Sequence, residues 1–236
     1  MLEGKILIVI PTYNEKENIE KLIRKIFEVN SNYHILIVDD NSPDGTSEIV
    51  KKLQTEFTNL HLITRSGKLG LGTAYIAGLK YGYQNGFTAI GTMDADFSHS
   101  PEYLPAMVEL LKKYDIGIGS RYVPGGGTKN WGIHRKILSR CANAFAKFML
   151  GLKSNDNTAG FRLYKREVLE KINLDNIFSN GYSFLVEMIY KCQKAGFKVG
   201  ETPIIFIDRK EGKSKISKNE IFKAIKTILR LKFSNE

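Results

Sequence analysis

The sequence of 236 residues contains only two cysteines, Cys141 and Cys192. Two cysteines cannot build a disulfide framework, and no zinc-type spacing surrounds them, so a reducing compartment is expected. No apolar stretch approaches the ~18 residues that a bilayer-spanning helix needs. The apolar run at residues 6–10 is stopped by Pro11, which leaves it too short for a signal peptide. These absences argue against a disulfide-rich secreted domain and an integral membrane protein.

Positive charge is present in excess. The chain has 35 Lys and Arg against 25 Asp and Glu, a formal net charge of +10, with 42% hydrophobic residues. That composition is ordinary for a globular protein and excludes disorder, collagen and coiled coil as descriptions of the whole chain. The net positive charge favours an anionic partner, for which nucleic acid, an acidic membrane surface and phosphates are the alternatives. No nucleic acid is expected, because no recognition motif or aromatic stacking motif accompanies the charge.

Short apolar runs alternate with amphipathic stretches over the first half of the chain. The runs predict five buried strands, at residues 6–10, 35–38, 60–64, 89–93 and 115–119. Helical spacing between them predicts an α/β fold with a mostly parallel sheet flanked by helices. Beyond Ser120 we expect a mobile glycine-rich segment at 122–130, helices at 133–152 and 182–195, a strand at 203–207, and a basic amphipathic helix from about 219 to 231.

Five acidic residues follow the predicted strands, namely Glu15, Asp39, Asp40, Asp94 and Asp96. Because ligands bind at the carboxyl ends of parallel strands, we expect these side chains to converge on one rim. Their repulsion needs a cation or hydrogen-bond donors to offset it. Mg²⁺ or Mn²⁺ suits oxygen ligands and also holds a pyrophosphate. Asp is common in turns and helix caps as well, so the placement after buried strands carries this prediction.

Three motifs resemble the family 2 glycosyltransferases with the GT-A fold. They are Pro-Thr-Tyr-Asn-Glu at 11–15, Val-Asp-Asp-Asn-Ser-Pro-Asp at 38–44 and Met-Asp-Ala-Asp at 93–96. Further stretches resemble the dolichol-phosphate mannose synthases of that family: 97–99, 119–122, 135–140, 160–164 and 208–215. The likeness extends from about residue 6 to residue 221.

The resemblance implies an inverting, metal-dependent transfer of mannose from GDP-mannose to the phosphate of dolichol or another polyprenol. A polyprenyl-phosphate glucosyltransferase that uses UDP-glucose is the alternative, because the GT-A core is shared. The implied organisation is a single GT-A domain over residues 1–236. Residues 1–120 form the nucleotide-sugar-binding half, 121–217 the acceptor-binding half and 218–236 the C-terminal amphipathic helix.

The matching motifs also imply roles for individual residues in donor binding. The nucleotide-sugar site is assigned to Pro11, Tyr13, Glu15, Asp39, Asp40, Asp94 and Ala95. Asp94 and Asp96 are the expected metal ligands under the diphosphate. Some relatives have a glutamine two places after the second aspartate, where this chain has Ser98, a weaker neutral ligand.

Cations are expected around the acceptor. Its nucleophile is a phosphate oxygen that is already ionised, so it needs little general-base help, but it must approach a second phosphate group against strong repulsion. Arginine suits this task because it binds phosphate bidentately and stays charged. We expect Arg121 to bridge the donor and acceptor phosphates and to be catalytic with Asp96. Arg135 and Ser139, one helical turn apart, are assigned to the acceptor phosphate. Arg209 and Lys215 lie in a basic loop and are assigned to the donor phosphates.

The C-terminal segment also suggests a membrane surface. Residues 208–236 hold nine Lys and Arg and four Asp and Glu. The basic amphipathic helix can rest among lipid headgroups or pack its apolar face on the sheet. The 133–152 helix leaves the same alternatives, as core or as a cradle for a lipid chain. We expect a peripheral protein on the cytoplasmic face of a membrane, held by these helices, by small membrane-anchor subunits or by a segment beyond this sequence.

Overall fold

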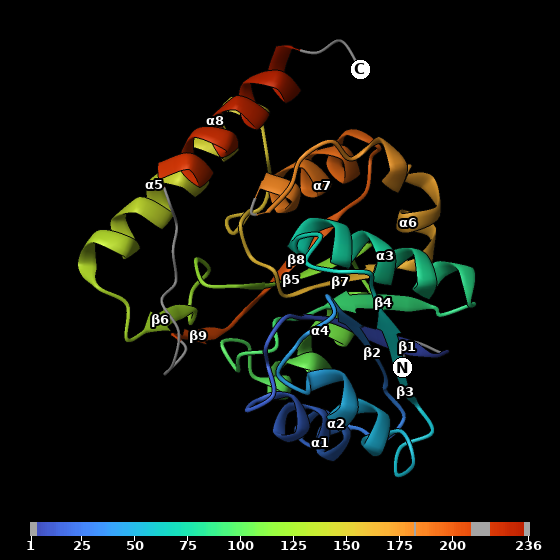
Figure 1. Cartoon of the computed structure of the whole chain (residues 1–236). Helices are drawn as coiled ribbons and strands as arrows, with labels where there is room; N and C mark the ends of the chain where they lie inside the picture. Colours follow the sequence, from blue (N-terminus) through green and yellow to red (C-terminus); the bar gives the residue numbers. More distant parts are fainter. Residues whose placement is uncertain (1–3, 182, 209–217, 234–236) are drawn as a thin grey trace.

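The computed structural model describes residues 4–181, 183–208 and 218–233 (Figure 1). Its centre is a seven-stranded sheet in the order β3-β2-β1-β4-β7-β5-β8. The strands are β1 (Ile6–Thr12), β2 (His34–Asp39), β3 (Leu60–Thr64), β4 (Ala89–Thr92), β5 (Ile116–Ser120), β7 (Arg162–Lys165) and β8 (Val199–Pro203). All neighbours are parallel except β7, which runs antiparallel to both β4 and β5. The predicted mostly parallel α/β sheet is confirmed.

Helices cover both faces of the sheet because its inner strands are apolar on both sides. In β1, Leu7 and Val9 face one layer, and Ile6, Ile8 and Ile10 face the other. The first layer holds α3 (Leu71–Gln84), α6 (Arg166–Lys171), the short helix η2 (Leu174–Asn176) and α7 (Ser183–Lys194). The second holds α1 (Ile19–Val29), α2 (Thr46–Leu53), the short helix η1 (Pro101–Tyr103) and α4 (Leu104–Leu110).

The prediction for the segment after β5 needs correction. Residues 122–130 were expected to be a mobile segment, but they contain β6 (Gly127–Lys129), which pairs in parallel with β9 (Ile205–Ile207). The single strand expected at 203–207 is in fact two. Ile204 divides it, since its N–H bonds to Ser120 of the main sheet and its carbonyl accepts from Gly127 of the small one.

Two long helices stand away from the sheet, α5 (Ile133–Leu150) and α8 (Lys218–Phe233) (Figure 1). α8 packs mainly on α5 and α7. The alternative in which its apolar face packs on the sheet is therefore wrong, and the membrane alternative stays a prediction. Ile228 and Leu231 are buried in that contact, whereas Phe222 and Phe233 remain 71% and 74% exposed. Of the helices in the described ranges, none combines the length and the apolar character that crossing a bilayer demands.

Close packing of α3 on the sheet depends on Gly78. A Cβ at this position would lie 2.1 Å from Cγ1 of Val9 in β1, a strand held on both sides by its neighbours. Gly78→Ala gains about 1 kcal/mol of helix propensity, but overpacking outweighs it, and we expect a net loss of roughly 1–3 kcal/mol in urea unfolding. In the control Gly67→Ala, the new Cβ meets nothing within 4 Å, and a change under about 0.5 kcal/mol is expected. Equal stabilities for the two variants would contradict the packing.

Candidate active site

A cavity of about 730 Å³ opens at the carboxyl ends of β1 and β4 and extends to α5 and α8. One end is polar, and the other is lined by apolar side chains that include Leu138, Phe145, Ile225 and Ile228. The cavity brings together most of the sequence-predicted residues: Pro11, Tyr13, Glu15, Asp40, Asp94, Ala95, Asp96, Ser98, Arg121, Arg135 and Ser139. Arg209 and Lys215 lie outside the described residues.

Asp39 does not line this cavity, contrary to the prediction. Its side chain is fully buried. The carboxylate accepts hydrogen bonds from the hydroxyls of Thr12, Ser42 and Ser47 at 2.6–2.8 Å and from the Ser42 backbone N–H at 2.8 Å. Asp39 therefore fastens the turn between β2 and α2, which is the ordinary structural use of an aspartate at such a position.

Asp40 does line the cavity, but its charge is compensated by the protein. Arg65 forms a buried ion pair with one carboxylate oxygen. The backbone N–H groups of Leu69 and Gly70 donate to the other oxygen at 3.1 and 3.2 Å. The convergence of five repelling carboxylates expected from the sequence is therefore reduced. The electrostatic case for a cation rests mainly on Asp94 and Asp96, with Glu15 on the same cavity wall.

The turn after β4 positions these two aspartates. Phe97 adopts φ of 59°, a left-handed conformation that is costly for an aromatic residue, and the tight turn lets the Ser98 N–H donate to Asp96 Oδ1 at 3.0 Å. The Tyr75 hydroxyl donates to Asp94 Oδ1 at 2.6 Å. Burial and the Asp94 carboxylate raise the pKa of Tyr75 well above its ordinary value, so it remains a donor. Sequence reasoning missed Tyr75, because nothing distinguishes it from other buried residues of α3.

His99, whose role the sequence left open, supports the same turn. Its Nδ1 accepts the Asp94 backbone N–H at 3.3 Å, and its ring stacks on Phe161. Burial lowers the pKa of His99, which favours the neutral imidazole that can accept this bond. Among the described residues, no three His, Cys, Asp or Glu side chains gather into a complete metal site.

Asp94 and Asp96 form an oxygen-only donor pair on the cavity wall, with Ser98 beside them. This pair suits a hard cation such as Mg²⁺ or Mn²⁺. Mg²⁺ in particular is commonly held by one or two carboxylates together with substrate phosphates. The residues therefore fit a metal that is shared between the protein and a bound diphosphate.

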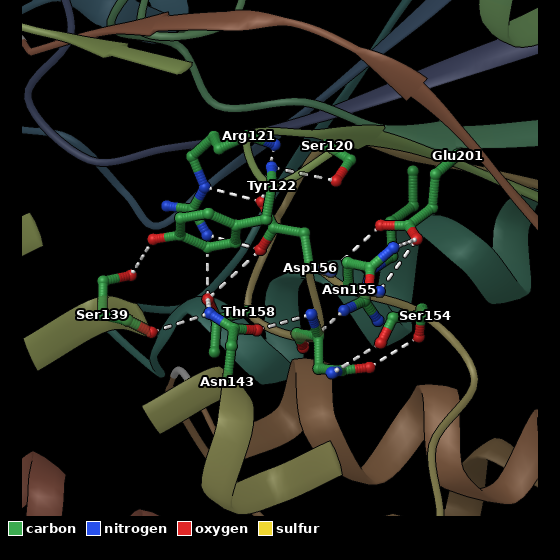
Figure 2. Close-up of polar contacts among 12 residues, drawn as sticks. Ser120, Arg121, Tyr122, Ser139, Asn143, Ser154, Asn155, Asp156, Thr158 and Glu201 are labelled. Carbon is green, nitrogen blue, oxygen red and sulfur yellow. Dashed lines mark hydrogen bonds and ion pairs between the residues drawn. The ribbon is translucent and has the colours of Figure 1, made fainter. Parts of the chain in front are cut away.

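Arg121 follows β5 and is held by a carboxylate that sequence reasoning missed (Figure 2). Its Nε and Nη2 donate to the two oxygens of Asp156 at 2.7 and 2.6 Å, and Nη2 also donates to Thr158 at 2.8 Å. Burial acts to lower the pKa of Arg121, but Asp156 more than offsets this effect and the pKa is raised. Arg121 is therefore a cation held in a fixed position on the cavity wall.

The loop that carries Asp156 is fastened from two sides (Figure 2). Glu201 of β8 accepts the backbone N–H groups of Asn155 and Asp156 at 2.8 and 3.0 Å. Asn143 of α5 accepts the Asn157 N–H at 2.7 Å and donates to Thr158 at 3.0 Å. No sequence pattern indicated these residues, since the loop has neither periodicity nor a known motif. The network ties α5 to the position of Arg121.

Arg135 and Ser139 share the cavity-facing side of α5, as their spacing predicted. The Tyr122 hydroxyl donates to Ser139 Oγ at 2.7 Å. Nη1 of Arg135 donates to Asp208 at 2.6 Å, and its guanidinium lies over the ring of Trp131. The guanidinium groups of Arg121 and Arg135 and the hydroxyl of Ser139 thus line the same cavity as the Asp94–Asp96 pair.

This fold and cavity define a glycosyltransferase of the GT-A architecture. The chain belongs to the family described as glycosyl transferase family 2, whose model matches residues 7–173. The expected family and enzyme class are confirmed.

Two curated relatives match most of the chain. The chain is 42% identical to polyprenol monophosphomannose synthase of Mycolicibacterium smegmatis over 221 residues. The aligned part covers 93% of this chain and 83% of the relative. The chain is 39% identical to undecaprenyl-phosphate mannosyltransferase of Micrococcus luteus over 226 residues. The aligned part covers 96% of this chain and 93% of that relative. The resemblance to polyprenyl-phosphate mannose synthases is confirmed by these matches.

Solved structures agree in fold. Glucosyl-3-phosphoglycerate synthase from Mycobacterium tuberculosis, in complex with Mn²⁺, UDP and glucosyl-3-phosphoglycerate, has a TM-score of 0.71 at 17% identity, over 99% of this chain and 82% of that one. The mannosyltransferase PcManGT from Pyrobaculum calidifontis, in complex with GDP-Man and Mn²⁺, has a TM-score of 0.61 at 16% identity, over 89% and 58%.

Proposed function

We propose that the protein transfers mannose from GDP-mannose to the phosphate of a polyprenol, such as dolichol or undecaprenol, with inversion at the anomeric carbon. One observation carries the proposal: a single cavity joins the Asp94–Asp96 pair to an apolar wall built by α5 and α8. A nucleotide sugar alone needs no such wall, whereas a polyprenyl phosphate needs both a phosphate site and apolar surface. The names of the two curated relatives support the same acceptor class.

In the donor site, Asp94 and Asp96 would hold Mg²⁺ or Mn²⁺ with the diphosphate, and the metal would offset negative charge on the departing GDP. Mn²⁺ in the solved structures of similar fold supports a divalent cation in general. Pro11, Tyr13, Glu15, Asp40 and Ala95 line the nucleotide-sugar part of the cavity. The proposed donor-phosphate contacts of Arg209 and Lys215 lie outside the described residues.

In the acceptor site, Arg121, Arg135 and Ser139 bind the acceptor phosphate. A phosphate oxygen attacks the anomeric carbon as the bond from that carbon to the diphosphate breaks, which inverts the configuration. The attacking oxygen is already ionised, so no base removes a proton. The two arginines offset the repulsion between acceptor phosphate and donor diphosphate, which is severe away from bulk water.

The outer faces of α5 and α8 fit a membrane surface, which is where a polyprenyl phosphate resides. Phe148 is 85% exposed on α5, and Phe222 and Phe233 are exposed on α8 together with Lys223 and Lys226. Exposed aromatic residues beside basic ones are typical of helices that lie among anionic headgroups. We propose peripheral attachment to the cytoplasmic face, with small membrane-anchor subunits as the alternative.

The test is a transfer assay on the purified full chain. Labelled GDP-mannose, Mn²⁺ and undecaprenyl or dolichyl phosphate in detergent are incubated, and label is counted in the organic phase. We expect metal-dependent transfer from GDP-mannose and little from UDP-glucose. Transfer from UDP-glucose alone would replace the proposal by the glucosyltransferase alternative. Absence of transfer from either donor, also when native membranes supply anchor subunits, would overturn both.

A further inference from the structure

Trp131, two residues before the start of α5, has both arginines of the proposed acceptor site close to its ring. Its ring centre is 5.4 Å from the guanidinium carbon of Arg121 and 4.1 Å from that of Arg135. Like charges repel, so the two cations do not gather through their own interaction. A tryptophan ring attracts each of them through its π-face. Together with Asp156 and Asp208, the indole therefore helps to hold both guanidinium groups at one point of the cavity wall.

The donor atoms at this point lack partners. The indole Nε1–H of Trp131 and the Nε–H of Arg135 are both buried without a hydrogen-bond partner in the described part of the chain. The Trp131 side chain is 8% exposed and lines the cavity. Buried donors without partners are rare in folded proteins, and an indole N–H can only donate. A group with several acceptor oxygens is the chemistry that would satisfy both, and because neither atom is exposed to solvent, its binding requires the neighbouring side chains to shift.

The carboxylates nearby are already engaged. Asp156 is bound by Arg121, and Asp208 is bound by Nη1 of Arg135. Neither is hydrogen-bonded to the indole. An additional anion is therefore the fitting ligand, and a neutral donor beside two cations binds it without adding to their mutual repulsion.

We propose that Trp131 is a binding residue for the acceptor phosphate. Its indole N–H donates to a phosphoryl oxygen, while its ring keeps Arg121 and Arg135 directed at the same group. The inference rests on the proposed function, because that function brings a phosphomonoester into this part of the cavity. Binding of the donor diphosphate by the indole is the competing outcome, which separate Michaelis constants distinguish.

The first test separates the N–H from the ring. Trp131→Phe keeps an aromatic ring for the arginines and removes the donor. Because hydrogen bonds to charged groups are strong, we expect the acceptor KM to rise about 10- to 100-fold, with the donor KM within about twofold of the original. Trp131→Leu removes the ring as well and should also lower kcat, since the two arginines lose their common support.

A matched control is Tyr33→Phe, which removes a donor from a buried aromatic residue outside the cavity lining. Both Michaelis constants should stay unchanged in this variant. Three results would overturn the inference: an unchanged acceptor KM in Trp131→Phe, an equal rise in both constants, or a rise in the donor KM alone, which would move the indole to the diphosphate.

A second test does not depend on turnover. Trp131 is the only tryptophan of the chain, so intrinsic fluorescence reports on this site alone. We expect a saturable spectral change with undecaprenyl phosphate in detergent micelles, and none with undecaprenol micelles or with GDP and Mn²⁺. A response identical for the alcohol and the phosphate would overturn the inference. Failure of mannose transfer with an intact phosphate-specific response would instead refute the proposed donor and leave the phosphate site standing.

Discussion

Asp96→Asn is expected to abolish mannose transfer, with a fall in kcat of at least about a thousandfold. Asn is nearly isosteric and still accepts the Ser98 N–H bond, so the turn after β4 should persist. It lacks the charge that a divalent cation requires, and charge stabilisation by such a cation is worth several kcal/mol in the transition state. Transfer at saturating Mn²⁺ and the Mn²⁺ affinity of the GDP complex are the two measurements.

Asp175→Asn provides the matched control for Asp96. Asp175 pairs with Lys80 at the surface and does not line the cavity. Losing an exposed ion pair costs at most about 1 kcal/mol, and activity should be unchanged. If Asp96→Asn unfolds near the original Tm and keeps more than a tenth of the activity, Asp96 does not hold the metal.

Asp156→Asn is expected to cost the largest share of stability, about 3–5 kcal/mol, because it leaves the buried guanidinium of Arg121 uncompensated. The new amide also places N–H groups against those of Arg121. For a chain of this size the Tm should fall by roughly 6–20 °C. Thermal unfolding followed by circular dichroism measures the shift, and activity should fall with it.

A double variant separates stability from catalysis. Replacing both members of a buried ion pair by apolar residues is often neutral, so Arg121→Met with Asp156→Leu should recover most of the lost stability. It should remain inactive, since the cation that we propose for the phosphates is gone. A stable and active double variant would show that Arg121 takes no part in the reaction, and a loss below about 1 kcal/mol for Asp156→Asn alone would contradict a tightly coupled pair.

Much of the sheet could be predicted because its parallel strands are continuous apolar runs, which indicate burial on both faces. β7 could not, because Arg162 and Lys165 interrupt its apolar character and its pairing partners are distant in sequence. The antiparallel insertion of β7 between β4 and β5 depends on contacts that no local pattern records.

The acidic rim of the site could be located for the same reason, since strand ends fall together in a parallel sheet. Which carboxylates face the cavity could not be predicted. Asp39 and Asp40 are adjacent, yet one is enclosed by hydroxyl groups and the other meets Arg65. Asp39 is enclosed because it accepts hydrogen bonds from Ser42 and Ser47, which follow it in the turn after β2. Asp156 was missed because a loop residue acquires its importance only from the cation it meets.

The position of β7 has a consequence for synthesis on the ribosome. β4 and β5 are made first, but the strand that separates them is made later, at residues 162–165. Until then the nascent sheet keeps open edges, which are the usual sites of unwanted strand pairing. The wall between Asp94 and Arg121 is also incomplete at that stage. A nascent chain halted before β7 should therefore depend on chaperones to stay soluble.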